Sequence, residues 1–134
     1  MSVEKLEKNI LQIGRQAKEA SRYVSQLSTN SKNEILCSAA ENLLKNKDII
    51  LKANELDIKE NKDKLNAATL DRLILDEKRI ESISNGLEEI SKLEDPVGKI
   101  IENWSRPNGL KIEKISIPLG VIGVIYESRP NVSA

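Results

Sequence analysis

A polar hexapeptide near the C-terminal end of the sequence carries the residues best suited to chemistry. The segment 126–131 reads Tyr-Glu-Ser-Arg-Pro-Asn and directly follows an apolar run over 121–125. The amide of Asn131 can donate a hydrogen bond to a developing oxyanion. The guanidinium of Arg129 can hold a phosphate or a carboxylate through two hydrogen bonds. An ordinary polar loop with a turn at Arg-Pro-Asn is the alternative interpretation, and the residue types leave both open.

Other candidate groups favour structural roles. Cys37 lies within an apolar helical pattern, and the sequence contains no histidine that could activate it as a nucleophile. The absence of histidine also excludes a Ser/His/Asp triad within the chain, and no metal site of the usual His/Cys type is expected. Gly120 and Gly123 lack the third glycine of a dinucleotide-binding fingerprint. The paired carboxylates at 76–77, 88–89 and 94–95 fall on predicted helix surfaces or ends.

Charge and composition exclude several classes of protein. The 134 residues carry 21 basic and 21 acidic side chains, whereas a polyanion-binding domain needs a clustered cationic excess. No apolar run reaches the roughly 18 residues of a membrane span. The charged N-terminal segment lacks the apolar core of a signal peptide, and the single cysteine excludes an internal disulfide framework. We therefore expect an ordered cytoplasmic protein that binds neither nucleic acid nor membrane.

The part of the sequence before residue 95 is typical of helices. It is highly charged and contains none of the four prolines, and its apolar residues recur at spacings of three and four. Over 3–27 this spacing predicts one long helix, whose apolar face should pack inside the protein or, alternatively, form a coiled-coil seam. Further helices are predicted over 35–44, capped by Ser28 or Ser31, over 49–57 after a bend near Asn46, over 67–75, and from a cap at Asp76 to Ile90.

Beyond Pro96 the apolar period shifts towards two, which indicates strands. A hairpin is predicted, with strands over 98–105 and 110–117 around an Asn108-Gly109 turn. The alternation changes phase between Ile112 and Ile115, which predicts a bulge or twist there. The wholly apolar run 121–125 is typical of a strand buried on both faces of a parallel sheet. Because such a strand needs neighbours and only nine residues follow it, we expect a fragment of an α/β domain.

The sequence resembles the gamma-glutamyl phosphate reductases, also called glutamate-5-semialdehyde dehydrogenases, of the aldehyde dehydrogenase superfamily. The most specific matching stretch is 118–132, Pro-Leu-Gly-Val-Ile-Gly-Val-Ile-Tyr-Glu-Ser-Arg-Pro-Asn-Val. A second is 104–110, Trp-Ser-Arg-Pro-Asn-Gly-Leu. Shorter matches are Leu27-Ser28-Thr29, Asn54-Glu55-Leu56-Asp57, Leu70-Asp71-Arg72-Leu73 and Asp95-Pro96-Val97-Gly98, so that the resemblance spans essentially the whole chain.

The resemblance implies the N-terminal part of an aldehyde dehydrogenase-like α/β fold. Residues 1–98 would be helices of the cofactor-binding domain, residues 99–118 a β-hairpin of the oligomerisation extension, and residues 119–134 the start of the nucleotide-binding sheet, including its first strand. The family reduces gamma-glutamyl phosphate with NADPH to glutamate 5-semialdehyde and phosphate in proline biosynthesis. The implied partners are this substrate, further copies bound through the hairpin, and glutamate 5-kinase.

The resemblance also implies roles for the polar hexapeptide. Asn131 occupies a place similar to that of the superfamily asparagine that stabilises the thiohemiacetal oxyanion. Tyr126, Ser128, Arg129 and Pro130 would line the cofactor cleft. The catalytic cysteine of the family lies in a downstream domain, so we expect this chain to be inactive by itself. The alternative function is a stand-alone helical interaction module that docks through the apolar face over 3–27.

Overall fold

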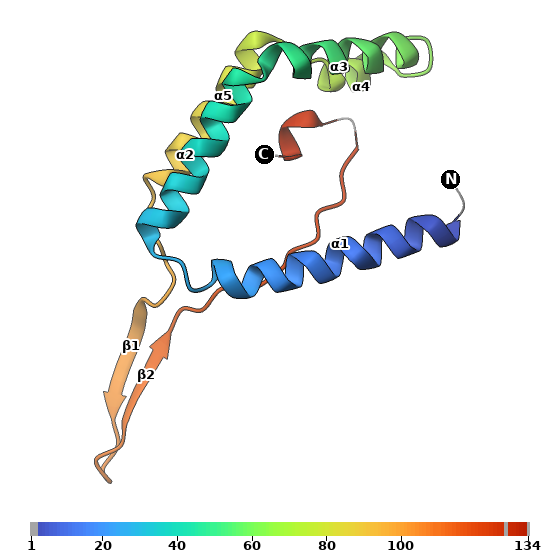
Figure 1. Cartoon of the computed structure of the whole chain (residues 1–134). Helices are drawn as coiled ribbons and strands as arrows, with labels where there is room; N and C mark the ends of the chain where they lie inside the picture. The colour runs from blue at the N-terminus through green and yellow to red at the C-terminus, as the bar shows by residue number, and fades with distance from the viewer. Residues whose placement is uncertain (1–2, 128, 134) are drawn as a thin grey trace. The chain divides into compact units, whose positions relative to one another are not determined.

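The computed structural model describes residues 3–127 and 129–133. Within these ranges it contains five α-helices, a two-stranded sheet and a short 3-10 helix (Figure 1). The chain forms two compact units: unit 1 combines Met1–Thr29 with Glu94–Gly123, and unit 2 combines Asn30–Leu93 with Val124–Ala134. Among the described helices, none is both long enough and apolar enough to cross a membrane.

Four helices make up most of unit 2, and their ends follow signals in the sequence. The predicted bend at Asn46 separates the first two of them. The side chain of Asp76 caps the last helix by accepting a hydrogen bond from the backbone N–H of Arg79 at 2.7 Å, as predicted. Asn66 caps the preceding helix in the same way through Thr69. The helices are α2 (Thr29–Lys45), α3 (Lys47–Asn61), α4 (Ala67–Leu73) and α5 (Glu77–Ser91).

The core of unit 2 lies between α2 and α5, which run alongside each other (Figure 1). Ala40 of α2 and Ser84 of α5 are each 1% exposed, and their small side chains let the two helices approach closely. The Ser84 hydroxyl donates a hydrogen bond to the backbone carbonyl of Ala40 at 3.2 Å. Ile80 and Leu87, one turn to either side of Ser84, complete the buried stripe of α5.

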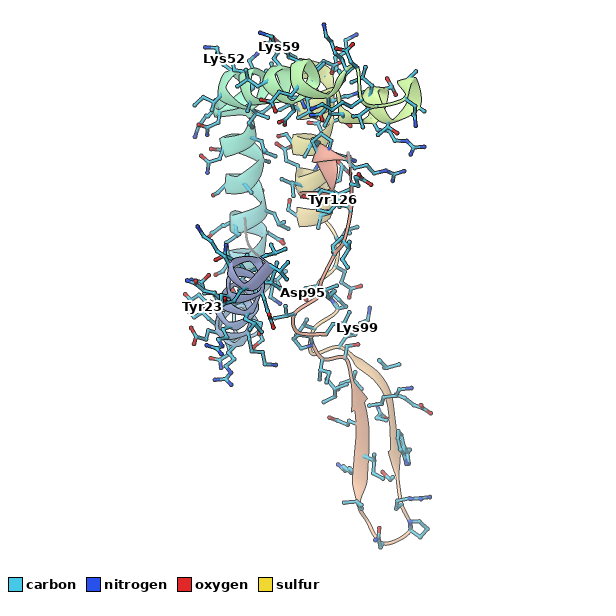
Figure 2. All side chains as sticks on the ribbon, turned by 90° about the vertical axis from the view of Figure 1, so that its right-hand side faces the viewer. Tyr23, Lys52, Lys59, Asp95, Lys99 and Tyr126 are labelled. Carbon is cyan, nitrogen blue, oxygen red and sulfur yellow. The ribbon has the colours of Figure 1, made fainter. Side chains whose placement is uncertain are left out.

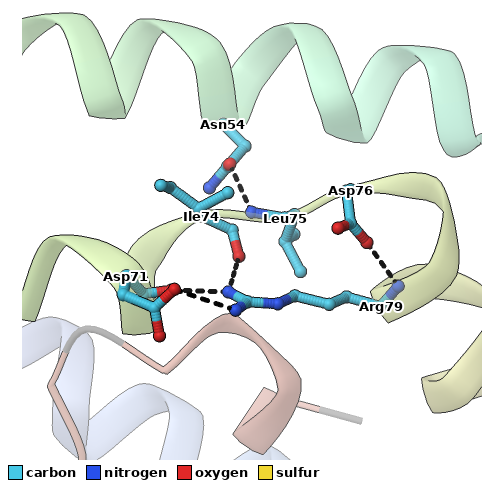
Figure 3. Close-up of polar contacts among 6 residues, drawn as sticks. All are labelled: Asn54, Asp71, Ile74, Leu75, Asp76 and Arg79. Atoms are coloured by element: carbon cyan, nitrogen blue, oxygen red, sulfur yellow. Dashed lines mark hydrogen bonds and ion pairs between the residues drawn. The ribbon is translucent and has the colours of Figure 1, made fainter. Parts of the chain in front are cut away.

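A buried asparagine joins α3 to the connection between α4 and α5. Asn54 is 5% exposed, and its amide nitrogen donates to the carbonyl of Leu73 at 2.8 Å. Its amide oxygen accepts from the backbone N–H of Leu75, also at 2.8 Å (Figure 3). Between these two residues Ile74 is extended, so the local backbone forms no regular secondary structure. Asn54 therefore supplies the hydrogen-bond partners that a helix or strand would otherwise provide.

Unit 1 contains α1 (Val3–Val24) and an antiparallel hairpin of β1 (Ile100–Ser105) and β2 (Lys111–Ile115). The predicted turn is confirmed: Gly109 has φ 82°, and its N–H donates to the carbonyl of Arg106 at 2.9 Å. A bulge is present, but on β1 rather than β2, because Ile100 pairs with Ile115 while Glu102 pairs with Lys114. The change in apolar alternation along β2, between Ile112 and Ile115, is thus accommodated by one extra residue on β1.

Two predictions about burial are wrong. The apolar face of α1 was expected to be packed, yet α1 has no buried residue in the described part of the chain, and Ile13 is 60% exposed. The run 121–125 was expected to be a buried strand, yet it is irregular and Ile122 is 67% exposed. A strand requires a hydrogen-bonded neighbour. The two strands in the described residues pair with each other, and neither forms a ladder with this run.

Replacing Asn54 with alanine should destabilise unit 2. The substitution leaves the Leu73 carbonyl and the Leu75 N–H without their partner, and we expect the free energy of unfolding to fall by about 2 kcal/mol. Urea unfolding followed by far-UV circular dichroism measures this change. Asn42→Ala on the exposed side of α2 is the matched control and should stay close to wild type. Equal stability of the Asn54 and Asn42 variants would contradict the structural role of the Asn54 amide.

Candidate functional site

Three of the five residues predicted for the site lie together at one cleft in unit 2. Arg129 precedes a short 3-10 helix, η1 (Pro130–Ser133), which contacts α5. Arg129, Pro130 and Asn131 line a cleft of about 330 Å³ with residues of α4, α5 and the connection between them. We call this the arginine cleft; its other lining residues are Asp71, Arg72, Ile74, Leu75, Arg79, Ser82 and Ile83.

Arg79 fixes the wall of the arginine cleft formed by α4 and α5 (Figure 3). Its guanidinium donates to the backbone carbonyls of Asp71 and Ile74. It also forms an ion pair with the Asp71 carboxylate, with an Nη2–Oδ1 distance of 3.2 Å. Because the backbone N–H of Arg79 is bound to Asp76, this one residue ties the end of α4 to the first turn of α5. The planar guanidinium suits such a role, since it donates in several fixed directions.

The lining of the arginine cleft has an excess of positive charge. Three arginines and one aspartate line it, so the formal excess is two positive charges. Asp71 already forms an ion pair with Arg79. Within the described residues, neither Arg72 nor Arg129 has an ion pair or a side-chain hydrogen bond, and both are exposed. The two guanidinium groups therefore retain their full capacity to bind an anion.

Asn131 lies in η1 at the edge of the same cleft and is exposed. The local turn is closed by the N–H of Val132, which donates to the carbonyl of Arg129 at 3.0 Å. Within the described residues the Asn131 amide has no hydrogen-bond partner of its own. This arrangement leaves the amide able to donate to a bound oxygen atom, which is the chemistry expected from the sequence.

The remaining two predicted site residues are not part of this arrangement. Tyr126 is about half exposed and does not line the arginine cleft. Ser128 lies outside the described residues. The structure therefore brings together the Arg-Pro-Asn half of the hexapeptide with α4 and α5.

Sequence reasoning missed the contribution of α4 and α5 to the cleft. Arg72 was named from the sequence only within a family match and Arg79 was not named, and no spacing rule relates either residue to Arg129. The sequence signal that could have located Arg79 is Asp76. Asp76 is the N-cap of α5, and an N-cap fixes the backbone of the first helical turn, which contains Arg79. No comparable signal in the sequence indicates that Arg72 lines the same cleft as residues 129–131.

Cys37 is exposed, so the prediction that it is a buried core residue is wrong. Its Sγ lies 3.6 Å from the Ser91 hydroxyl, at the last residue of α5, whereas the close helix contact is one turn further along α2, at Ala40. Cys37 does not line the arginine cleft. In the described part of the chain, no group of three or more Cys, Asp or Glu side chains is placed to hold a metal ion.

Two surface ion pairs shift the pKa values of the groups that form them. A hydrogen bond between Lys92 and Glu89, at 2.8 Å, raises the pKa of Lys92 and lowers the pKa of Glu89. A hydrogen bond to Glu77 raises the pKa of Lys47 in the same way. These groups are exposed and paired, so the shifts indicate local ion pairing and not a general acid or base.

Comparison with known proteins gives consistent matches. No protein-family model matches the chain. It is 56% identical over 121 residues to the gamma-glutamyl phosphate reductase of Caldanaerobacter subterraneus subsp. tengcongensis, and 52% identical over 120 residues to that of Halothermothrix orenii. These alignments cover 90% and 89% of this chain but 29% of either relative.

Solved structures with the same fold carry the same name. The crystal structure of gamma-glutamyl phosphate reductase from Thermotoga maritima matches with a TM-score of 0.88 at 36% identity, over 92% of this chain and 30% of that one. The enzyme from Saccharomyces cerevisiae matches with a TM-score of 0.85 at 32% identity, over 91% of this chain and 31% of that one. The predicted fold class, the N-terminal region of an aldehyde dehydrogenase-like α/β fold, is thereby confirmed. Over about nine tenths of its length the chain is homologous to the gamma-glutamyl phosphate reductases, and it spans about three tenths of the length of those relatives.

Proposed function

We propose that these residues form part of an enzyme that reduces L-gamma-glutamyl phosphate with NADPH to L-glutamate 5-semialdehyde and phosphate, in proline biosynthesis. The observation that supports the proposal most strongly is the 46–56% identity to gamma-glutamyl phosphate reductases over about nine tenths of the chain. The position of Asn131 beside two arginines at one cleft is consistent with a substrate that carries a carbonyl and a phosphate. A cytoplasmic location and association with glutamate 5-kinase belong to the same proposal.

Asn131 would stabilise negative charge on the substrate carbonyl oxygen. When a nucleophile adds to an acyl carbon, the carbonyl oxygen gains charge, and a fixed amide donor lowers the energy of that state. The Asn131 side chain is exposed at the cleft and has no partner among the described residues, so it can donate without breaking another bond.

The nucleophile would come from outside these 134 residues. Cys37 is the single cysteine of the sequence, and its sulfur contacts Ser91 on the α2–α5 side of unit 2. It shares no cleft with Asn131. We therefore propose that this chain contributes the oxyanion donor and is inactive without the rest of the enzyme.

A nicotinamide cofactor would supply the hydride for the reduction. The arginine cleft is at the small end of the range for ligand pockets, about 300–1,000 Å³, and its charge suits an anionic group. Its residues thus fit one phosphate-bearing end of a dinucleotide and not the whole molecule. Arg129 and Pro130 would hold that end, and Tyr126 would border the cofactor outside the cleft.

The hairpin would mediate self-association. Side chains project from both sides of the hairpin ribbon (Figure 2), and none of the residues in its two strands is buried. Ile101 and Trp104 are among its exposed apolar side chains. A lone two-stranded hairpin is marginally stable in water, so its exposed edges and apolar side chains favour pairing with another strand. The apolar face of α1 is exposed as well, which is the observation that keeps the interaction-module alternative open.

Asn131→Ala should slow catalysis without greatly weakening substrate binding. In the complete gene product that contains these residues, we expect kcat to fall by roughly 10²–10³-fold because one oxyanion donor is lost. The assay follows NADP⁺ reduction with glutamate 5-semialdehyde and phosphate, which is the reverse of the proposed reaction. Asn42→Ala is the control and should keep wild-type kcat. An unchanged kcat in the Asn131 variant removes the proposed role, and a wild-type protein without any activity overturns the proposed function.

Substitutions in the two exposed apolar surfaces separate self-association through the hairpin from docking through α1. Trp104→Glu places a charge on the hairpin and should shift the protein towards smaller species in sedimentation velocity, whereas Ile13→Glu on α1 should not. The opposite pattern, with assembly lost only in the Ile13 variant, would support the interaction module and count against the hairpin.

A further inference from the structure

Two arginines from distant parts of the sequence line one cleft, and neither is paired with a carboxylate among the described residues. Arg72 lies on α4 and Arg129 precedes η1, and both line the arginine cleft. Neither has an ion pair within the described residues, and the single carboxylate of the cleft is already paired with Arg79. Two like charges that share a small cleft repel each other, and a bound anion offsets that repulsion because it attracts both.

The wall that carries Arg72 is held in place before any ligand arrives. Asp71, its neighbour, is fixed to Arg79 through both its carboxylate and its carbonyl. The backbone that follows α4 is bound to the buried Asn54 amide. The backbone at Arg72 is thus already ordered, so the entropy cost of binding falls mainly on the Arg72 side chain, which is exposed.

We propose that the arginine cleft is an oxyanion-binding site in which Arg72 and Arg129 together hold a phosphate or carboxylate group of a small ligand. Each guanidinium can offer two parallel hydrogen bonds to such a group. The Ser82 hydroxyl and the Asn131 amide line the same cleft and can donate further bonds. The volume of about 330 Å³ admits one end of a small molecule.

Anion binding at this cleft stands independently of the reductase reaction; only the identity of the natural ligand rests on the proposed function. Three anionic groups are then available: the acyl phosphate of the substrate, its carboxylate, and a phosphate of the dinucleotide cofactor. All share the chemistry that two guanidinium groups recognise.

The test is a titration of the 134-residue chain with inorganic phosphate, followed by heteronuclear NMR and by calorimetry. We expect saturable binding, with shifted amide signals at Ser82 and Asn131. Arg72→Gln and Arg129→Gln should each weaken binding about tenfold or more, because each removes a charge-assisted pair of hydrogen bonds. Arg106→Gln in the hairpin turn is the matched control, since it removes the same charge outside the cleft.

Several results would overturn the proposal. These are a wild-type protein without saturable phosphate binding, Arg72 and Arg129 variants that bind as wild type does, and an Arg106 variant that weakens binding equally. Circular dichroism checks that each variant keeps its helices, and Arg72→Lys, which retains the charge, should keep more affinity than Arg72→Gln. If the isolated chain lacks helical structure, the same titration is made on the complete gene product, and the same results decide.

Competition assigns the source of the anion once phosphate binding is established. Displacement by NADP⁺ but not by NAD⁺ assigns the cleft to the extra phosphate of the cofactor, and displacement by glutamate assigns it to the substrate carboxylate. Displacement by acetyl phosphate, a small acyl phosphate, but by neither NADP⁺ nor glutamate assigns it to the acyl phosphate of the substrate. A complete gene product that reduces gamma-glutamyl phosphate but binds no anion at the cleft would overturn this inference alone. A complete gene product that binds the anion but lacks that activity would overturn the proposed function alone.

Discussion

The arrangement of unit 2 depends on one buried amide. Asn54 satisfies a carbonyl and an N–H of the extended connection between α4 and α5, where regular secondary structure stops. A buried backbone group without a partner costs more free energy than a typical hydrogen bond returns, and the Asn54 side chain supplies partners for two backbone groups of this half-buried connection. With the connection fixed, α5 starts at Asp76 and Arg79 reaches back to Asp71. The wall of the arginine cleft is thus a consequence of Asn54, although Asn54 itself does not line the cleft.

Charge balance gives that wall its chemical character. Arg79 and Asp71 neutralise each other and act as structure, whereas Arg72 and Arg129 remain without ion pairs in the described residues. Arginine therefore has two roles within one cleft: an arginine paired with a carboxylate stabilises the fold, and an arginine without such a pair is available to bind an anion. The overall neutrality of the sequence conceals this local excess, because 21 basic and 21 acidic side chains balance only when summed over the whole chain.

Local signals in the sequence were sufficient for the helices and the hairpin. The breaks at Asn46 and Asp76 and the turn at Gly109 were predictable, because caps and turns depend on a few neighbouring residues. Burial was not predictable in the same way, since it depends on neighbours distant in sequence: the α1 face and the run 121–125 have the pattern of buried elements and are exposed. Three of the ten residues that line the cleft, 129–131, were candidates from the sequence; the other seven are brought there by the packing of α4 and α5.

The bulge in β1 has a consequence for any strand that pairs with the hairpin. Because cross-strand partners share a face and alternate residues do not, Trp104 and Ile112 lie on one face of the ribbon and Ile100 and Ile115 on the other. The extra residue at Ile101 produces this division between an apolar patch near the tip and one near the base. If a pairing strand is shifted by one residue, its apolar side chains lie on the face opposite to the apolar patch of the hairpin, both near the tip and near the base. The bulge therefore favours one pairing register over the other registers that an open strand edge permits.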